Sequence, residues 1–382
     1  MVTIGIVGAG SFGTALAIVL ERMGHRLNLY VRDTDTLWCI EACQENSNYL
    51  QGHKLNPKTI HLKDSMSETV KDADYVFVTV PSPKIHEVMN ELKQLLCKET
   101  VIVLTSKGMV ERGSSSSVSD VTKDSFPTNK IAGLYGITFA DLIAGGDGFS
   151  SMCIASEDEN IADRVANLLT ETGEKQSNFR IYISTDLKGA EFGGAMKNIY
   201  AIAMGLYDGY LDLKKPQSRL SSGSLLSLCI LEFIEFGLAY EAELCTLLGP
   251  SGVGDIVACV SDSSRNYTYG KWRAKLEFDK KAIKEERPPR LHEGYDTVKS
   301  AKKIAEAFDI DTPILDAVHS IFYNEDENKK EQIVKETISN MIKELSKNII
   351  LNEDSLCKIL HHINPNHKDS TERSQRSGFS SR

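Results

Sequence analysis

The first half of the chain alternates short apolar runs with segments whose apolar residues recur at helical spacing. Short apolar runs bounded by turn residues predict buried strands, and the apolar stripes between them predict helices that cover a sheet. Strands alternating with helices indicate an α/β domain with a doubly wound, mostly parallel sheet. The predicted strands are residues 2–7, 26–31, 75–80, 101–105, 131–135, 151–155 and 180–183, and the helices between them are residues 12–23, 84–96 and 160–170.

After about residue 185 long helical patterns dominate, at residues 189–210, 223–248, 295–306, 313–322 and 329–346. This part predicts an all-helical domain, with a charged surface loop at 276–289 that ends in two prolines. The chain beyond residue 364 is polar and cannot bury enough apolar surface to order itself. We therefore divide the sequence into an α/β domain at 1–185, a helical domain at 186–348 and a disordered polar tail at 364–382.

Composition narrows the class of protein further. A net charge of −9 over 382 residues argues against nucleic acid or an anionic membrane as the main partner. The eight cysteines form no pattern with metal-ligand spacing, which indicates reduced thiols in a cytoplasmic protein and no metal site. We expect no membrane span, because no stretch approaches the roughly 20 apolar residues that one needs. The N-terminus leads directly into a core strand, which leaves no room for a signal peptide.

Three glycines lie between the first predicted strand and the first predicted helix. Gly8, Gly10 and Gly13 give the spacing G-x-G-x-x-G in the stretch GAGSFGTALA. Glycines at this point allow a tight turn and a bare backbone beside a pyrophosphate, and the helix N-terminus that follows favours anions. In this strand–turn–helix context the pattern predicts a dinucleotide site.

Two lysines and an aspartate are candidates for proton chemistry. Lys107 lies where a predicted strand ends, at the edge of the sheet where α/β proteins bind ligands, although a solvated loop lysine would have the same pattern. Lys197 stands in a helix that is otherwise nearly free of charge. Such a lysine either extends to the surface or lies in a pocket, where burial would lower its pKa and make it a proton acceptor. Asp255 is the one acid in the middle of a glycine-rich stretch.

Ser264, Arg265 and Asn266 offer a hydroxyl, a guanidinium and an amide in succession. This set of donors suits a phosphate group, although a capped turn with a surface arginine would have the same sequence. Leu291 and Glu293 belong to a further candidate segment at residues 291–295, which could equally be only the start of a helix.

These blocks, in this order, resemble the bacterial-type NAD(P)-dependent glycerol-3-phosphate dehydrogenases over roughly residues 1–345. The matching stretches are GAGSFGTALA, NSNYLQGHKL, VPS, LTSKG, EFGGAMKNIYAIAMGLYDG, SGVGDI with SSRNYTYG, and HEGYDT with DTPILDAV. The resemblance implies a Rossmann dinucleotide-binding domain, a helical substrate domain and a site between them. It also implies the reversible reduction of dihydroxyacetone phosphate to sn-glycerol 3-phosphate, a precursor of glycerophospholipids, with NAD or NADP as cofactor.

The resemblance also implies roles for individual residues. Lys197 matches the catalytic lysine that exchanges the proton of the substrate's C2 hydroxyl, and Lys107 matches a lysine that touches cofactor and substrate. The further substrate positions are Gly136, Thr138, Asp255, Ser264, Arg265 and Asn266. The cofactor positions are Gly8, Gly10, Ser11, Phe12, Gly13, Arg32, Tyr49, Lys107, Ala140, Arg265, Leu291 and Glu293.

Three stretches depart from the family pattern. The family's Gly-Pro-Ser-Phe-Ala is Gly136-Ile137-Thr138-Phe139-Ala140 here, Cys259 replaces a threonine, and residues 211–230 align only loosely. We expect these changes to alter affinity more than the type of reaction.

Other readings of the sequence stay open. The alternatives are a related two-domain hydroxy-acid dehydrogenase and a protein that senses dinucleotides without catalysis. Because Arg32 and Asp33 are neighbours after the second strand, we expect both NAD and NADP to bind. A homodimer is possible.

Overall fold

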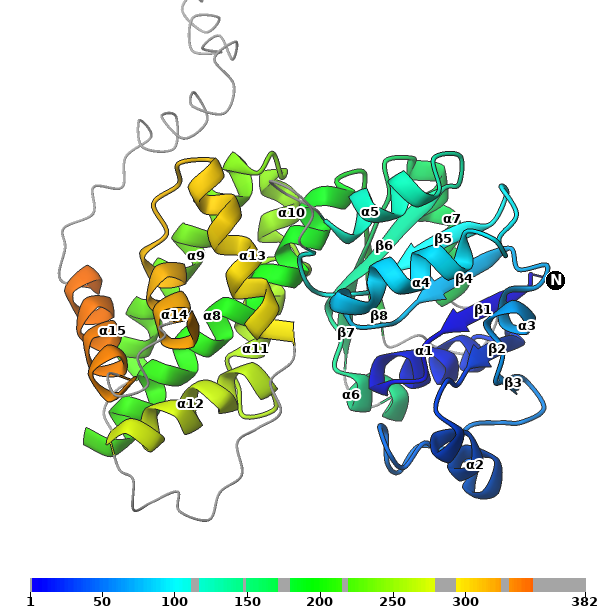
Figure 1. Ribbon diagram of the computed structural model, residues 1–382, viewed down its shortest axis with the longest axis horizontal. Helices are drawn as coiled ribbons and strands as arrows, with labels where there is room; N and C mark the ends of the chain where they lie inside the picture. Colours follow the sequence, from blue (N-terminus) through cyan, green and yellow to red (C-terminus); the bar gives the residue numbers. More distant parts are fainter. Residues whose placement is uncertain are drawn as a thin grey trace, which may run out of the picture.

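The computed structural model describes residues 2–110, 117–146, 149–170, 179–214, 219–278, 293–323 and 330–345. Figure 1 shows a sheet with flanking helices on one side of the molecule and a bundle of helices on the other. The predicted fold class, a mostly parallel doubly wound sheet followed by a helical domain, is confirmed. The polar tail at 364–382 lies outside the described residues.

The described strands form one eight-stranded sheet in the order β3-β2-β1-β4-β5-β6-β7-β8. All neighbouring pairs are parallel except β6 and β7, so β1, β2, β4, β5 and β6 end at the same edge. The strands are β1 Ile4–Val7, β2 Leu27–Tyr30, β3 Ile60–Lys63, β4 Tyr75–Val78, β5 Val101–Leu104, β6 Ile131–Ile137, β7 Ser150–Ala155 and β8 Phe179–Ser184. The sequence pattern does not predict β3, because only its first residue is fully buried.

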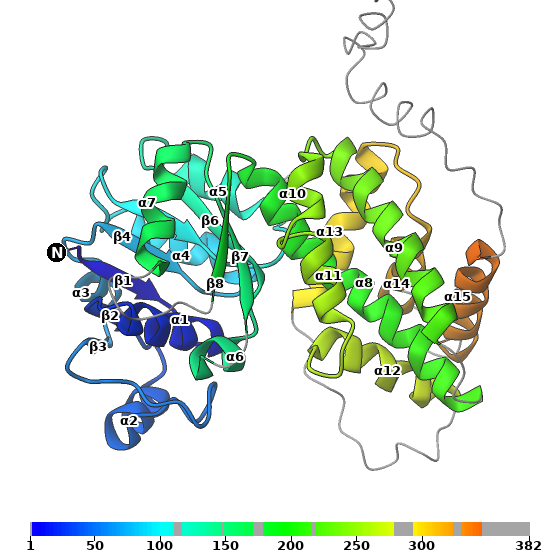
Figure 2. The same cartoon turned by 180° about the vertical axis from the view of Figure 1, so that it is seen from behind.

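Helices cover both faces of this sheet (Figures 1 and 2). They are α1 Ser11–Arg22, α2 Thr34–Cys43, α3 Met66–Val70, α4 Ile85–Leu92 after the short 3₁₀ helix Ser82–Lys84, α5 Val118–Ser125, α6 Ala140–Gly145 and α7 Glu159–Leu169. The apolar pattern does not predict α2, α3, α5 or α6. The start of α5 is fixed by a capping box. The Ser117 side chain accepts from the Asp120 backbone, and the Asp120 side chain accepts from the Ser117 backbone.

The helical domain is built around α8, which runs through its middle with α9 on one side and α13 on the other (Figures 1 and 2). Its core contains the buried rings of Phe192, Phe233 and Phe236. The helices are α8 Leu187–Lys214, α9 Arg219–Ala239, α10 Leu244–Leu248, α11 Val253–Cys259, α12 Arg265–Phe278, α13 Glu293–Ala307, α14 Pro313–Tyr323 and α15 Lys330–Leu345.

Two predicted segments are wrong in detail. The helix predicted at 223–248 is broken, because Glu241 adopts a left-handed conformation with φ 69° and turns the chain between α9 and α10. The loop predicted at 276–289 begins later, since α12 continues to Phe278; residues 279–292 lie outside the described residues.

One described helix departs from our expectation about membranes. Leu220–Ala239 in α9 is long and apolar enough to cross a bilayer, with a mean hydropathy of 1.5. Only 39% of that apolar window is buried, yet Phe233 and Phe236 lie in the core of the domain. Length and composition alone do not separate a core helix of this kind from a membrane span.

Candidate functional site

The glycine-rich loop between β1 and α1 has the geometry that a pyrophosphate requires. A side chain at Gly13 would collide with the Gly8 carbonyl oxygen, so this glycine lets the helix pack closely on the strand. At Gly10, by contrast, a Cβ would meet nothing within 4 Å, which leaves the backbone open. Gly10 is also the N-cap of α1 and no side chain caps that end. The first N–H groups of α1 therefore remain available to an anion.

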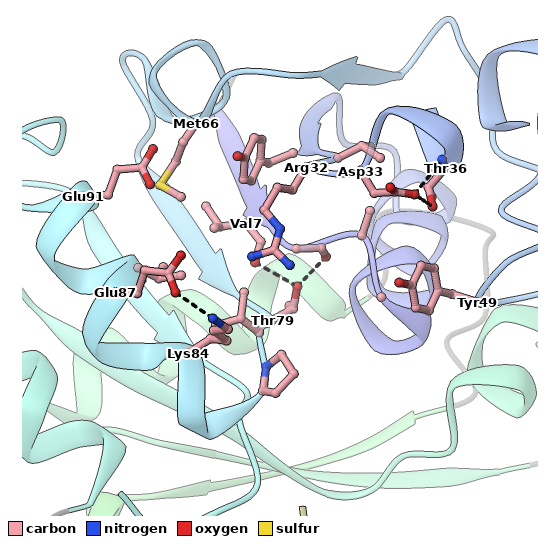
Figure 3. A pocket seen from close by; sticks show the side chains of 18 residues that line it. Val7, Arg32, Asp33, Thr36, Tyr49, Met66, Thr79, Lys84, Glu87 and Glu91 are labelled. Atoms are coloured by element: carbon pink, nitrogen blue, oxygen red, sulfur yellow. Dashed lines mark hydrogen bonds and ion pairs between the residues drawn. The ribbon is translucent and has the colours of Figure 1, made fainter. Parts of the chain in front are cut away.

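A cavity of about 270 Å³ lies beside this loop, at the carboxyl ends of β1, β2 and β4 (Figure 3). Four of the predicted cofactor positions, Gly8, Gly10, Arg32 and Tyr49, line it. The cavity also has lining residues that the sequence analysis does not name, namely Tyr30, Met66, Thr79, Lys84, Glu87 and Glu91. Of these, Thr79 had a sequence signal, because it directly precedes the family block VPS.

The predicted positions in α1 lie just behind the loop. Ser11, Phe12 and Gly13 form its first turn, and the Ser11 hydroxyl donates to the Tyr49 carbonyl oxygen at 2.7 Å. The Thr79 hydroxyl donates to the Gly8 carbonyl oxygen at 2.7 Å. These bonds connect the loop to its neighbours and fix its shape.

Arg32 and Asp33 behave differently at the end of β2. The Asp33 carboxylate caps α2, where it accepts from the Thr36 backbone N–H at 2.8 Å and from the Thr36 hydroxyl. The hydrogen bonds to Thr36 hold the pKa of Asp33 below its ordinary value. Arg32 instead points into the cavity (Figure 3). Both Thr36 contacts use Asp33 Oδ2, and Asp33 also lines the cavity. The carboxylate that could bind ribose hydroxyls and the guanidinium that could meet a 2′-phosphate therefore both border it.

Lys107, Lys197 and Asp255 meet at the junction of the two domains. Lys197 lies on α8, Asp255 on α11 and Lys107 just after β5. Lys197 Nζ donates to Asp255 Oδ1 at 2.8 Å, and Lys107 Nζ donates to Asp255 Oδ2 at 3.1 Å. Lys197 and Asp255 are buried, with 8% and 1% of their surface exposed. One buried carboxylate is therefore shared by two ammonium groups.

The surroundings shift the pKa values of the two lysines in opposite directions. Burial lowers the pKa of Lys107, and the nearby Lys197 charge adds to this effect, while Asp255 opposes it. Burial also acts to lower the pKa of Lys197, but the attraction of Asp255 and the Cys259 sulfur outweighs it and raises the pKa. The expectation that a pocket would lower the pKa of Lys197 is therefore wrong.

Gly136 and Thr138 hold Lys107 in this position. Its ammonium donates to the Gly136 carbonyl oxygen at 2.8 Å and lies 3.4 Å from the Thr138 hydroxyl oxygen. Gly136 has φ 120°, and a Cβ there would lie 2.7 Å from the Ser151 carbonyl oxygen, so a glycine is needed. Ala140 follows as the first residue of α6.

The predicted phosphate positions stand at the start of α12. Asn266 Nδ2 donates to Asn198 Oδ1 at 2.8 Å, which connects this group to the residue beside Lys197. Ser264 is buried, whereas Arg265 is exposed. Leu291 lies outside the described residues, and Glu293 begins α13 without a described side chain.

Cys259 and Asn198 are site neighbours to which the sequence analysis gives no role. The Cys259 sulfur lies 3.2 Å from Lys197 Nζ and 3.7 Å from Asp255 Oδ1. Four-residue spacing places Cys259 and Asp255 on one face of α11, a signal present in the sequence. Among the described residues no cluster of three or more His, Cys, Asp or Glu side chains could hold a metal ion.

A glycine-rich loop on a Rossmann-like sheet, with a buried lysine–aspartate cluster at its junction with a helical domain, defines a class of two-domain dehydrogenases. Residues 3–162 match the NAD-dependent glycerol-3-phosphate dehydrogenase N-terminus, and residues 186–334 match the corresponding C-terminus. The chain therefore belongs to the NAD-dependent glycerol-3-phosphate dehydrogenase family.

Individual relatives agree with this assignment. Glycerol-3-phosphate dehydrogenase [NAD(P)+] of Alcanivorax borkumensis is 34% identical over 320 residues, which cover 84% of this chain and 89% of that protein. The structure of glycerol-3-phosphate dehydrogenase from Coxiella burnetii has a TM-score of 0.76 at 26% identity and covers 90% of this chain and 99% of its own. The Plasmodium falciparum glycerol-3-phosphate dehydrogenase shares the fold, with a TM-score of 0.74 at 21% identity, covering 92% of this chain and 97% of its own.

Proposed function

We propose that this protein catalyses the reversible, NAD(P)-dependent reduction of dihydroxyacetone phosphate to sn-glycerol 3-phosphate, a supply reaction for glycerophospholipids. The observation that carries the proposal is the buried Lys107–Asp255–Lys197 cluster, in a chain of this family whose sheet also carries the cavity beside the glycine loop. A hydroxy-acid substrate or a purely dinucleotide-sensing role has no comparable support, since the matched relatives carry the name glycerol-3-phosphate dehydrogenase.

The glycine loop would hold the cofactor. The open backbone at Gly10 and the uncapped N–H groups of α1 suit its pyrophosphate, while Arg32 and Tyr49 border its adenosine half. When bound, the nicotinamide supplies or accepts the hydride. Because Arg32 and Asp33 both line the cavity, we propose that NAD and NADP both bind.

The remaining side chains would bind and polarise the substrate. Two cations beside the C2 oxygen stabilise the negative charge that develops on it during reduction, and burial strengthens that effect. We assign the phosphate group to Ser264, Arg265 and Asn266, whose adjacent donors suit its oxygens. The bond from Asn266 to Asn198 places this group next to the helix that carries Lys197.

Loss of reduced-nicotinamide absorbance tests the proposal directly. Purified protein should oxidise NADH and NADPH when dihydroxyacetone phosphate is added, and should reduce the oxidised cofactors with sn-glycerol 3-phosphate. Short 2-keto acids are the matched controls for a hydroxy-acid dehydrogenase. Cofactor binding without turnover on any of these substrates would instead support the sensing role.

We also propose that the protein works in the cytoplasm, that α9 is a core helix, and that two copies pair through their helical domains. Free cysteines throughout the described residues fit a reducing compartment. Recovery of active protein in the soluble fraction without detergent, with a dimer's mass by light scattering, would support these points. Recovery only in the membrane fraction would make α9 a membrane segment.

A further inference from the structure

We propose that Asn46 is a positioning residue for the cofactor, because its side-chain amide fixes the peptide groups of the glycine loop in the orientation that binds pyrophosphate. The inference rests on the proposed function and deepens its cofactor half. Asn46 belongs to the block NSNYLQGHKL, of which only Tyr49 is among the described residues that line the cavity. The effect of Asn46 on the cofactor therefore passes through the loop.

The Asn46 side chain is fully buried between the glycine loop and α1. Its Nδ2 donates to the Ala9 carbonyl oxygen and to the Thr14 hydroxyl oxygen, both at 2.8 Å. A carbonyl oxygen can only accept, so the amide nitrogen, and not the amide oxygen, must face Ala9. Asn46 Oδ1 is then buried without a partner among the described residues. Because such a group is costly, packing alone does not explain an amide at this position.

The bond to Ala9 sets the direction of the next N–H group of the loop. The described peptide bonds are all trans, and in a trans peptide group the C=O and the following N–H point in opposite directions. With the Ala9 oxygen held toward Asn46, the Gly10 N–H faces away from the amide. The Thr79 hydroxyl holds the Gly8 carbonyl oxygen at 2.7 Å, which orients the Ala9 N–H in the same way. Two successive N–H groups beside the cavity are thus oriented by side chains.

The backbone of Asn46 also connects the loop to Tyr49. The Asn46 carbonyl oxygen accepts from the Tyr49 N–H at 3.1 Å and from the Leu50 N–H at 2.7 Å, which forms the turn that carries Tyr49. The Ser11 hydroxyl donates back to the Tyr49 carbonyl oxygen. These backbone contacts do not depend on the side chain at position 46. A substitution there therefore removes the bonds to the glycine loop and α1 and leaves the turn in place.

Loss of the amide should weaken cofactor binding without slowing the chemical step. The freed Ala9 peptide group can rotate, and the cofactor must order it again on binding, which costs affinity. NAD and NADP share the pyrophosphate, so both should be affected alike. The amide contacts Ala9 and Thr14 and has no described bond to the lysine–aspartate cluster, so turnover at saturating cofactor should persist.

The test is the Kd for NADH and for NADPH, from titration of cofactor fluorescence, in the wild type, Asn46→Ala, Asn46→Asp and Asn56→Ala. Asn46→Ala should raise both Kd values roughly tenfold and change kcat at saturating cofactor by less than about twofold. Asn56→Ala is the matched control, because the Asn56 amide donates to Glu21 at 3.0 Å, at the other end of α1. It should leave both Kd values unchanged.

Asn46→Asp separates a lost donor from lost packing. An ionised carboxylate only accepts and repels the Ala9 carbonyl oxygen, so both Kd values should rise at least as much as in Asn46→Ala. A protonated carboxyl has an O–H that can donate to that oxygen, and burial favours the protonated form. The affinity of Asn46→Asp relative to the wild type should therefore recover as the pH is lowered from about 8.5 to about 6, whereas that of Asn46→Ala should not.

Thermal melts without cofactor show whether each variant is folded. If Asn46→Ala does not fold, the pH dependence of Asn46→Asp decides the question. Wild-type Kd values in Asn46→Ala would overturn the inference, as would equal losses in Asn46→Ala and Asn56→Ala, or an affinity of Asn46→Asp that follows the wild type at every pH. A wild type that binds both cofactors but turns over neither substrate would instead refute the proposed function, and the Kd comparison would still decide the role of Asn46.

Discussion

Adding a methyl group should weaken cofactor binding at Gly10 but lower the stability of the fold at Gly13. The two alanine variants are therefore a matched pair. At Gly10 the Cβ meets nothing within 4 Å, and φ is −72°, a value that alanine adopts easily. Reduced freedom of the unfolded chain would stabilise the protein by about 0.4–1 kcal/mol, while alanine is a poorer N-cap by a similar amount. The stability of the cofactor-free protein should therefore change by less than about 1 kcal/mol.

At Gly13 the same methyl group has no room, because it would collide with the Gly8 carbonyl oxygen and the Thr79 hydroxyl. Overpacking of this kind costs about 1–3 kcal/mol. Since 1 kcal/mol moves Tm by roughly 2–4 °C in a domain of this size, Gly13→Ala should melt roughly 2–12 °C below the wild type.

Cofactor binding is measured by repeating the melts with NADPH at about 100 times its Kd. The wild type should gain about 2.7 kcal/mol, hence a Tm rise of roughly 5–10 °C. Gly10→Ala should lose much of this rise and Gly10→Val all of it, because the added carbons occupy the space of the pyrophosphate. A full rise in Gly10→Val would refute the assignment of the loop, and a wild-type Tm in Gly13→Ala would refute the packing argument.

Three further outcomes are expected. Burial raises the pKa of Glu232 to about 8, although hydrogen bonds from two backbone N–H groups of α14 act to lower it. The folded protein therefore keeps a proton on Glu232 that the unfolded chain releases above about pH 4.5. Wild-type stability relative to Glu232→Gln should therefore fall as pH rises from 4.5 to 8, by about 1.4 kcal/mol per pKa unit, in urea denaturation; a constant difference would contradict this. Arg265→Ala should raise the KM for dihydroxyacetone phosphate roughly ten- to hundredfold, with partial recovery in Arg265→Lys; an unchanged KM would place the phosphate elsewhere. Cys259→Val should lower kcat about two- to tenfold whereas Cys259→Thr should not, because threonine keeps an acceptor for the Lys197 ammonium and valine does not. Equal rates in the two variants would show that the sulfur contact does not contribute to turnover.

The sequence predicts the architecture well because apolar runs mark most strands and apolar stripes at helical spacing mark the long helices. Apolar runs and helical stripes locate seven of the strands and eight of the helices, namely α1, α4, α7, α8, α9, α13, α14 and α15. They do not locate α2, α3, α5, α6, α11 or α12. The short β3 is missed because it forms no apolar run and only one of its residues is buried. Helix α5 is missed because a capping box, and not an apolar stripe, sets its start.

The site is harder to predict than the fold. The glycine spacing predicts the dinucleotide loop, but nothing in the sequence shows that Asp33 caps α2 and also lines the cavity beside Arg32. Similarly, an isolated lysine in an apolar helix suggests a lowered pKa, whereas the pKa of Lys197 is raised by a carboxylate 58 residues farther along the chain. Contacts of that range depend on tertiary packing, which local patterns do not encode.

The sharing of Asp255 has a mechanical consequence as well as a chemical one. Its Oδ1 is bound by a lysine of the helical domain and its Oδ2 by Lys107, which follows a strand of the sheet. Any hinge motion that separates the domains must stretch the second of these contacts. Because removal of one partner from a buried ion pair is costly, the shared carboxylate opposes separation of the domains. The same carboxylate thus couples the relative position of the two domains to the geometry of the two lysine amines.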